Sequence, residues 1–222
     1  MTAAEGAKNK LLIYGAGGHG RVVLDAAFAC GTFDVCGLLD DDPDTHGRQV
    51  HGVTVLGGRD VLESSEFRSC RVIVGIGDSG ARRRIAETLA RLGHEFARVI
   101  HPSAMIGRGA EIGAGTVILP MAVVHTDVRI GDHVIVNTAA TVDHDAVIGD
   151  FVHLSPGSHL GGEVHVGRNS HVGLGASIVP GRRIGSEVVV GAGAAVIEDV
   201  PDGIIVAGVP ARAIREESRG GG

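Results

Sequence analysis

The sequence predicts two structural parts: a small α/β domain with a parallel sheet, followed by a solenoid of short parallel β-strands. A strand, glycine turn and helix pattern occurs twice in the first hundred residues, and an aliphatic residue then recurs at every sixth position. The composition agrees, because only 3% of the 222 residues are aromatic and 36 are glycine. We therefore expect a core of Val, Ile and Ala rather than of large rings.

The first part is expected to cover residues 11–101. Its stretch KLLIYGAGGHGRVVLDAAFACG reads as an aliphatic strand, a glycine turn and a helix, and DVCGLLDDDP as a second strand that ends in acids. The stretch CRVIVGIGDSGARRRIAETLARLG repeats the strand, turn and helix. Alternating strands and helices imply a parallel sheet with flanking helices. About 95 residues suffice for one half of a dinucleotide-binding domain, so the domain is half-Rossmann-like.

The first glycine turn predicts a bound diphosphate. Gly15, Gly17 and Gly20 match the pattern GxGxxG, and Asp40 follows after some twenty-odd residues. Such glycines let the backbone approach a pyrophosphate at a helix N-terminus, and the acid can meet a ribose hydroxyl. One half-domain holds one nucleotide, so a nucleoside diphosphate is favoured over NAD(P) and over a purely structural turn. His19 inside the turn requires either space or a ligand.

Three consecutive arginines, Arg82, Arg83 and Arg84, lie on the predicted helix after the second glycine turn. They are expected to face water, with a phosphate contact as the alternative.

The second part, expected over residues 102–204, has a period of six residues. From Ile106 to Val196, sixteen consecutive positions at this spacing are Ile, Val or Leu, and Gly follows nine of them. This period fits neither a helix nor a lone strand. It predicts a triangular β-solenoid of about five coils, with three hexads to a coil and the aliphatic residues stacked inside. Gly at the corners tolerates unusual backbone angles.

The hexads IGAGTV, IGDHVI, VGRNSH, IGSEVV and VGAGAA resemble the repeat of the left-handed β-helix acyltransferases. The stretch IVAGVPARAI resembles the segment that closes the helix in that superfamily. Residues 205–222 are therefore expected to be a closing segment and tail, and residues 1–10 a flexible N-terminus. The resemblance implies a left-handed parallel β-helix and a homotrimer with active sites between subunits.

The chain as a whole resembles bacterial nucleotide-sugar N-acetyltransferases, such as those acting on UDP-linked 4-amino sugars of the bacillosamine pathway and on GDP-perosamine. It also resembles the related sialic acid O-acetyltransferases. The segments that carry this resemblance are IYGAGGHG, LLDDD, VGIGDS, VIHPSA, NTAATVDHDAVIGDFVHLSPG and AGVPAR. The resemblance implies transfer of acetyl from acetyl-CoA to a nucleotide-linked 4-amino-4,6-dideoxy sugar, in glycan biosynthesis such as that of O-antigen. O-acetylation is the alternative activity, and a non-catalytic β-helix scaffold is the alternative from another class.

The triplet Asp143-His144-Asp145 interrupts an otherwise aliphatic and small stretch. The resemblance makes His144 the general base and Asp145 the acid that renders its ring more basic, with Asp143 as the fallback partner. The chemistry agrees, because a His with a pKa near 6.5 can take a proton from an amine that attacks a thioester. The repeat contains no cysteine, so we expect direct attack in a ternary complex and no acyl-cysteine intermediate.

The resemblance also implies two sets of binding residues. The expected acetyl-CoA contacts are His153, Gly162, Gly173, Leu174 and Ala192. The expected nucleotide-sugar contacts are Gly17, Gly18, His19, Asp40, Asp41 and Gly77.

Arg182 and Arg183 interrupt the apolar six-residue pattern and are expected either to contact CoA phosphates or to be solvated.

No metal is expected. His153 and His171 are eighteen residues apart and should stack on consecutive coils, which raises a zinc hydratase as a rival function. A zinc site needs further ligands, however, and a third histidine is not apparent.

Charge and apolar content exclude other classes. A formal charge of −6 without a basic run argues against a nucleic-acid binder. No apolar stretch approaches the roughly 18–20 residues of a membrane span, and the start shows no signal peptide. Cys30, Cys36 and Cys70 match no metal spacing and are expected to be reduced thiols. A cytoplasmic protein is therefore expected.

Overall fold

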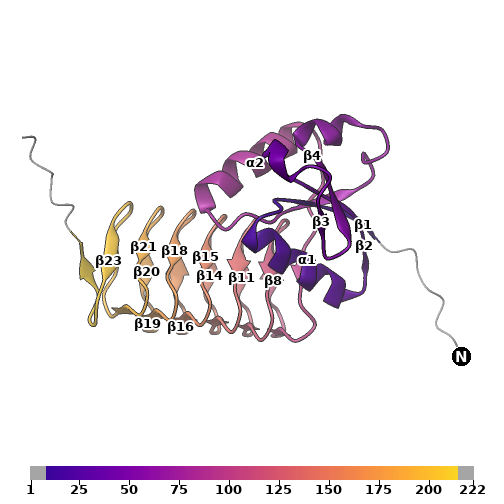
Figure 1. The fold of residues 1–222 in the computed structure, drawn as a ribbon. Coiled ribbons are helices and arrows are strands. Elements are labelled where there is room, and N and C mark those ends of the chain that lie inside the picture. Colours follow the sequence, from indigo (N-terminus) through magenta and orange to yellow (C-terminus); the bar gives the residue numbers. More distant parts are fainter. Residues whose placement is uncertain (1–8, 215–222) are drawn as a thin grey trace, which may run out of the picture.

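The computed structural model describes residues 9–214, in which an α/β domain lies beside a long β-helix (Figure 1). The predicted flexible N-terminus and the predicted C-terminal tail lie partly outside these residues, at 1–8 and 215–222. Neither of the two α-helices in this part of the chain has the length and apolar character needed to cross a membrane. Cys30, Cys36 and Cys70 are all free thiols.

The α/β domain is built on a five-stranded sheet with the order β3-β4-β2-β1-β5, in which only β3 runs antiparallel to its neighbour. Its strands are β1 (Asn9–Tyr14), β2 (Phe33–Leu39), β3 (Gln49–Val50), β4 (Val53–Gly57) and β5 (Arg71–Val74). Its helices are α1 (Gly18–Cys30), α2 (Ser79–Arg91) and the short 3₁₀ turns η1 (Pro43–Thr45) and η2 (Arg59–Glu63). Strand β1 begins two residues before the expected start of the domain.

Side chains of β1 point alternately to the two faces of the sheet, and each face packs against one of the two helices. Leu11 and Ile13 pack in the core that includes α1, whereas Leu12 and Tyr14 pack in the core that includes α2. The turn between β1 and α1 requires glycine, because a side chain at Gly20 would collide with the carbonyl oxygen of Gly15. The first glycine turn is therefore closed tightly, and α1 starts at the carboxyl edge of the sheet.

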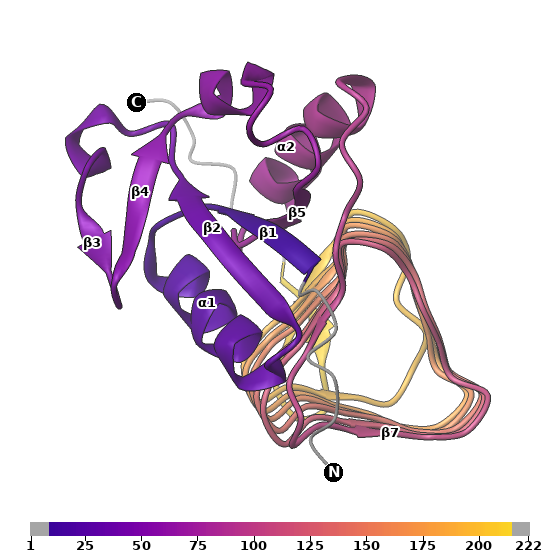
Figure 2. The same cartoon turned by 90° about the vertical axis from the view of Figure 1, so that its right-hand side faces the viewer.

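The β-helix has three faces, each a sheet of strands of two or three residues, and Figure 2 shows its triangular section end-on. The first face contains β6 (Val99–Ile100), β9 (Val117–Ile118), β12 (Ile135–Val136), β15 (His153–Leu154), β18 (His171–Val172), β21 (Val189–Val190), β23 (Ile205–Ala207) and β24 (Arg212–Ala213). The second contains β7 (Met105–Ile106), β10 (Val123–Val124), β13 (Thr141–Val142), β16 (His159–Leu160), β19 (Ser177–Ile178) and β22 (Ala195–Val196). The third contains β8 (Glu111–Ile112), β11 (Arg129–Ile130), β14 (Val147–Ile148), β17 (His165–Val166) and β20 (Arg183–Ile184).

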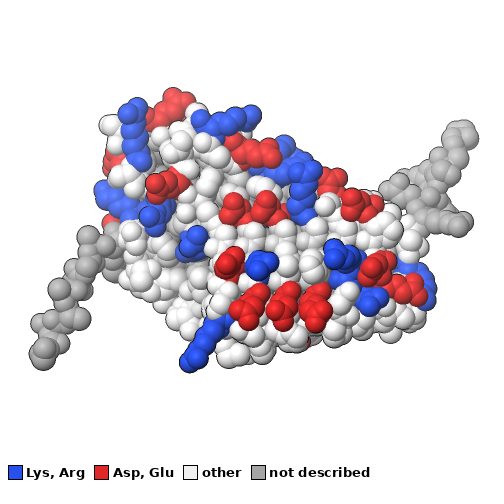
Figure 3. Space-filling view, turned by 180° about the vertical axis from the view of Figure 1, so that it is seen from behind, with Lys and Arg blue, Asp and Glu red and all other residues white. Residues whose placement is uncertain are grey.

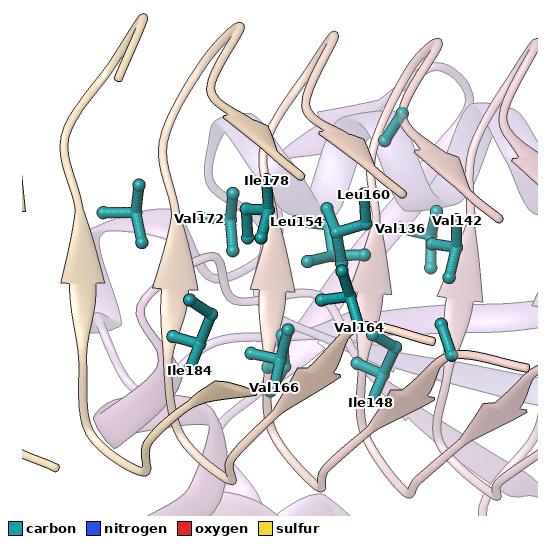
Figure 4. Close-up of a cluster of buried hydrophobic side chains, with 14 of the residues drawn as sticks. Val136, Val142, Ile148, Leu154, Leu160, Val164, Val166, Val172, Ile178 and Ile184 are labelled. Carbon is teal, nitrogen blue, oxygen red and sulfur yellow. The ribbon is translucent and has the colours of Figure 1, made fainter. Parts of the chain in front are cut away.

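From β6 to β22, equivalent residues pair eighteen positions apart in parallel register, as Val124 does with Val142. The last coil is shorter, and Val190 pairs with Val206 sixteen positions on. In strands β9 to β22 the second residue points inward, so that Val136, Leu154 and Val172 form one column of the core (Figure 4). The predicted fold class, an α/β domain followed by a hexapeptide β-helix, is confirmed. Strand β6 pairs with β9, so the β-helix starts within the residues expected to belong to the first domain.

The corners of the β-helix adopt left-handed backbone conformations at non-glycine residues. Asp127, Asp145 and Glu163, on three consecutive coils, have φ values of 56°, 60° and 60°. Asp tolerates this region better than most residues. The corner between the second and third faces therefore carries a stack of acidic side chains.

Candidate functional site

The corner between the second and third faces holds the predicted general base. His144 follows β13, and its Nδ1 lies 2.8 Å from Oδ2 of Asp145. Both side chains are more than half exposed, at 56% and 58%. The hydrogen bond with Asp145, supported by the charges of Asp143 and Glu163, raises the pKa of His144 above its ordinary value. With Nδ1 bonded to Asp145, the ring presents Nε2 for proton transfer.

Asp143, the expected fallback partner, lies elsewhere at the same corner. Its Oδ1 is 3.9 Å from Nε2 of His125, one coil earlier. Gly162, one coil after His144, lies beneath the imidazole: a Cβ at this position would be 2.7 Å from both Cε1 and Nε2 of His144. Thus Gly162, expected to contact acetyl-CoA, also adjoins the predicted base.

The glycine turn after β1 has open backbone at the N-terminus of α1. A Cβ on Gly17 or Gly18 would meet no atom within 4 Å. Gly17 is the N-cap residue and provides no side-chain cap. The free N–H groups of a helix N-terminus bind anions such as phosphate.

The two predicted acids after β2 have different partners. Asp40 accepts hydrogen bonds from the backbone N–H of Ala16 at 2.8 Å and of Asp42 at 3.0 Å, so it braces the glycine turn. Asp41 accepts from the hydroxyl of Tyr14 at 2.6 Å and from Nη2 of Arg59 at 2.7 Å. Burial opposes ionisation of Asp41, but the hydrogen bonds from Arg59 and Tyr14 outweigh it and lower the pKa of Asp41.

A cavity of about 340 Å³ adjoins Asp41. Its walls combine polar groups of Tyr14, Asp41 and Arg59 with side chains of α2 that include Arg84, Ile85 and Leu89. The cavity lies at the carboxyl edge of the parallel strands, where open α/β sheets bind ligands.

Three histidines gather where the α/β domain meets the first face of the β-helix. The rings of His153 and His171 stack as predicted, with centroids 4.8 Å apart and planes 5° apart. The ring of His19 lies 6.1 Å from that of His153, and its buried Nε2 has no hydrogen-bond partner among residues 9–214. Burial lowers the pKa of His19 to about 4 and that of His153 to about 3, so both rings are neutral at pH 7.

The partners of His153 fix its tautomer. Nδ1 lies 3.0 Å from the carbonyl oxygen of Gly77, which can only accept, so Nδ1 carries the proton. Nε2 lies 3.2 Å from Nδ2 of Asn137 and accepts from it. Asn137 was not among the site residues predicted from the sequence. Its signal is an amide at the hexad position that is most often glycine, directly after an inward residue.

The expectation that Arg82 faces water is wrong. Its side chain is 1% exposed and lies between α2 and two coils of the β-helix, whose backbone carbonyls accept its hydrogen bonds. Arg82 is buried because α2 docks on the β-helix, and this docking cannot be predicted from the sequence pattern. Arg83 pairs with Glu87 and Glu187, while Arg84 is exposed.

The remaining predicted acetyl-CoA contacts lie at a different corner from His144. Gly173, Leu174 and Ala192 lie on consecutive coils at the corner between the first and second faces, where Leu174 is 59% exposed. Arg182 approaches Asp199 at 3.8 Å. Within one chain, the predicted site residues therefore form three groups around the triangular section.

No group of three or more His, Cys, Asp or Glu side chains within residues 9–214 is arranged to hold a metal ion. Figure 3 shows acidic side chains in a row along the β-helix, interspersed with basic ones, rather than a continuous basic surface on this face.

Comparisons with known proteins bear on both domains. Residues 10–89 match the family described as the PglD N-terminal domain. The acetyltransferase domain of PglB from Neisseria gonorrhoeae, solved alone and with acetyl coenzyme A, is 42% identical with a TM-score of 0.87. The former structure covers 93% of this chain and 100% of that domain.

Two further relatives are enzymes whose names state a substrate. A point mutant of perosamine N-acetyltransferase from Caulobacter crescentus, solved with CoA and GDP-perosamine, is 36% identical with a TM-score of 0.88. That match covers 95% of this chain and 99% of the other. UDP-N-acetylbacillosamine N-acetyltransferase from Bacillus subtilis is 40% identical over 114 residues. That alignment spans 48% of this chain and only 50% of the length of the Bacillus enzyme.

Proposed function

We propose that this chain, which belongs to the family of nucleotide-sugar N-acetyltransferases, transfers acetyl from acetyl-CoA to the 4-amino group of a UDP- or GDP-linked 4-amino-4,6-dideoxy sugar. The observation that carries the proposal is the hydrogen bond between His144 and Asp145. It supplies an exposed imidazole with raised basicity, as attack by an amine on a thioester requires.

In the proposed mechanism His144 acts as the general base in a ternary complex. The amine nitrogen attacks the thioester carbonyl, the N–C bond forms and His144 Nε2 takes the proton from nitrogen. Asp145 stabilises the resulting imidazolium. Collapse of the tetrahedral intermediate breaks the C–S bond and releases CoA thiolate, which regains a proton from His144 or solvent. No protein nucleophile is needed.

The α/β domain would hold the nucleotide. Gly17 and Gly18 offer backbone N–H groups to the diphosphate. We place the nucleoside in the 340 Å³ cavity beside Asp41, where Arg59 and Tyr14 supply polar contacts. His19 and Gly77 would then border the sugar, next to His153 and the thioester end of acetyl-CoA.

The distribution of these groups supports an assembly in which two chains form each site. His144 lies at the corner between the second and third faces, whereas the α/β domain covers the first face (Figure 2). In the homotrimer that we propose, the His144 corner of one subunit meets the His153 face and nucleotide turn of a neighbour. The predicted CoA contacts at the corner between the first and second faces would line the same cleft.

We place the reaction in the cytoplasm, where acetyl-CoA and nucleotide sugars are available, and its product in glycan biosynthesis such as that of O-antigen. The test is turnover with acetyl-CoA and a panel of UDP- and GDP-linked 4-amino-4,6-dideoxy sugars, followed by thiol release and mass spectrometry. An acetylated product resistant to hydroxylamine supports an amide. A labile product indicates an ester and O-acetylation, and absence of turnover with every amino sugar contradicts the proposal.

A further inference from the structure

Arg82 has an acceptor for each of the five N–H donors of its guanidinium. The acceptors belong to two elements of the α/β domain and to two coils of the β-helix. They are the carbonyl oxygens of His133 (from Nε, 2.9 Å), Ile76 and Gly77 (from Nη1, both 2.9 Å) and Phe151 (from Nη2, 2.7 Å), and the hydroxyl of Ser79 (from Nη2, 3.2 Å). The carbonyl oxygen of Val152 is a further, longer acceptor for Nη2 at 3.4 Å.

All of these acceptors are neutral. Within residues 9–214 no carboxylate lies within ion-pair distance of Arg82, although the side chain is only 1% exposed. Burial lowers the pKa of Arg82 to about 10, which still leaves it protonated at pH 7. A buried charge is costly unless it is fully hydrogen-bonded. A methionine could fill a similar volume without that cost, so packing alone does not account for an arginine here.

One acceptor links Arg82 to the candidate site. The carbonyl oxygen of Gly77 accepts from Arg82 Nη1 and also from Nδ1–H of His153. A carbonyl oxygen has two lone pairs, so these two donors occupy both. Arg82 thereby orients the Gly77 carbonyl toward the imidazole, and the imidazole keeps Nε2 for Asn137.

The charge of Arg82 acts in the same direction. It lies near His19, His153 and His171 and lowers the pKa of each, in addition to the larger effect of burial. His171 and His19 lower the pKa of His153 further, whereas the hydrogen bond to Gly77 raises it. At His171, the charge of Asp78 partly offsets the lowering of the pKa. The net result is a neutral cluster where the two domains meet.

We propose that Arg82 is a positioning residue for acetyl transfer, which fixes the Gly77 loop against the β-helix and holds His153 as the neutral Nδ1–H tautomer. The inference about the reaction rests on the proposed function, whereas the inference about the tautomer does not. The role concerns both substrates, because Gly77 belongs to the proposed sugar site and His153 to the proposed acetyl-CoA site.

The first test is the tautomer of His153 in the wild-type protein, read from long-range ¹H–¹⁵N correlations of its ring and assigned with His153→Gln. We expect an Nδ1–H signature at pH 7. An Nε2–H or charged ring would overturn the proposal, whether or not the protein proves to be an acetyltransferase.

The second test compares Arg82→Lys and Arg82→Met with Arg91→Met, an exposed arginine in the last turn of the same helix. Lys keeps the charge but cannot reach all five acceptors. We expect both Arg82 variants to raise KM for both substrates on the order of tenfold to a hundredfold and to disturb the His153 tautomer. The Arg91 variant should behave as wild type. If Arg82→Met does not fold, Arg82→Lys decides. A folded Arg82→Lys with wild-type KM values and an unchanged His153 signature would refute the positioning role.

Discussion

The imidazole of His144 packs directly against Gly162, so that a Cβ at position 162 would lie 2.7 Å from Cε1 and Nε2 of the ring. These two positions are eighteen residues apart and thus equivalent on consecutive coils. Since Nδ1 is held by Asp145, the ring cannot turn freely away from an added methyl group without loss of that hydrogen bond.

Gly162→Ala is therefore expected to lower kcat on the order of tenfold to a hundredfold, because the base is displaced from its reactive position. Steady-state kinetics at pH 7.5 would measure the loss. In the His144→Ala background the same substitution should add little, since it acts through the ring. Equal losses in both backgrounds would show that Gly162 acts independently of His144.

Asp145→Asn is expected to change the pH dependence of kcat/KM. The base must be neutral, so activity rises with pH through the pKa of His144. Asp145 raises that pKa; without its charge, the acidic limb should move to lower pH. The plateau rate should fall on the order of tenfold because the ring is a weaker base. Asp127→Asn is the matched control, since Asp127 occupies the same left-handed corner one coil earlier. An acidic limb that stays in place in Asp145→Asn would argue against the pairing.

Arg59→Ala should weaken nucleotide-sugar binding, because it removes a cation that lines the cavity and donates a hydrogen bond to Asp41. We expect KM for the nucleotide sugar to rise by about fivefold to thirtyfold, the effect of losing a charge-assisted hydrogen bond. KM for acetyl-CoA should not change. Arg71→Ala provides the control, since Arg71 pairs with Glu95 where β5 begins, at the opposite edge of the sheet. An equal change of both KM values in Arg59→Ala would place the cavity outside the nucleotide site.

Acid should destabilise the junction between the domains. His133 lies between Phe96 and Phe151, and burial lowers its pKa to about 4. His133 thus binds a proton less readily in the folded state than in the unfolded state, where its pKa is about 6.5. The contribution of His133 is complete above about pH 6.5 and declines as the pH falls toward 4. At about pH 5 the loss is on the order of 2 kcal/mol.

Urea unfolding at one fixed protein concentration, at about pH 7.5 and 5, tests this expectation. His133→Asn suits the corner, because Asn tolerates its positive φ of 55°. The variant should be less stable at neutral pH, since it loses the aromatic packing, but should lose about 2 kcal/mol less on acidification. The same acid sensitivity in both proteins would assign the effect to other groups.

The sequence predicted features that repeat or that are local, and it missed those that depend on docking. The six-residue period of the aliphatic positions determines the coil, the register and the stacking of His153 on His171. The family resemblance and the adjacency of the two residues suggested the partnership of His144 and Asp145, and Asp145 makes this hydrogen bond from a left-handed corner. No periodicity shows that α2 docks at the corner formed by residues 131–134 and 149–152, so the burial of Arg82 and the bond from His153 to Gly77 could not be read from the chain. Asp40 matched a ribose-binding pattern, which stays a prediction; the sequence did not show that its carboxylate also accepts a hydrogen bond from the backbone N–H of Ala16.

In the proposed reaction, His144 removes the proton from the attacking amine. The most direct measurement is kcat for acetyl transfer to the preferred amino sugar, compared between wild type, His144→Ala and His51→Asn in the exposed turn between β3 and β4. We expect His144→Ala to lower kcat by about 10²–10⁴, with KM for both substrates and the free energy of unfolding little changed. His51→Asn should match wild type. A His144→Ala variant that keeps kcat within a few-fold of wild type would contradict the claim.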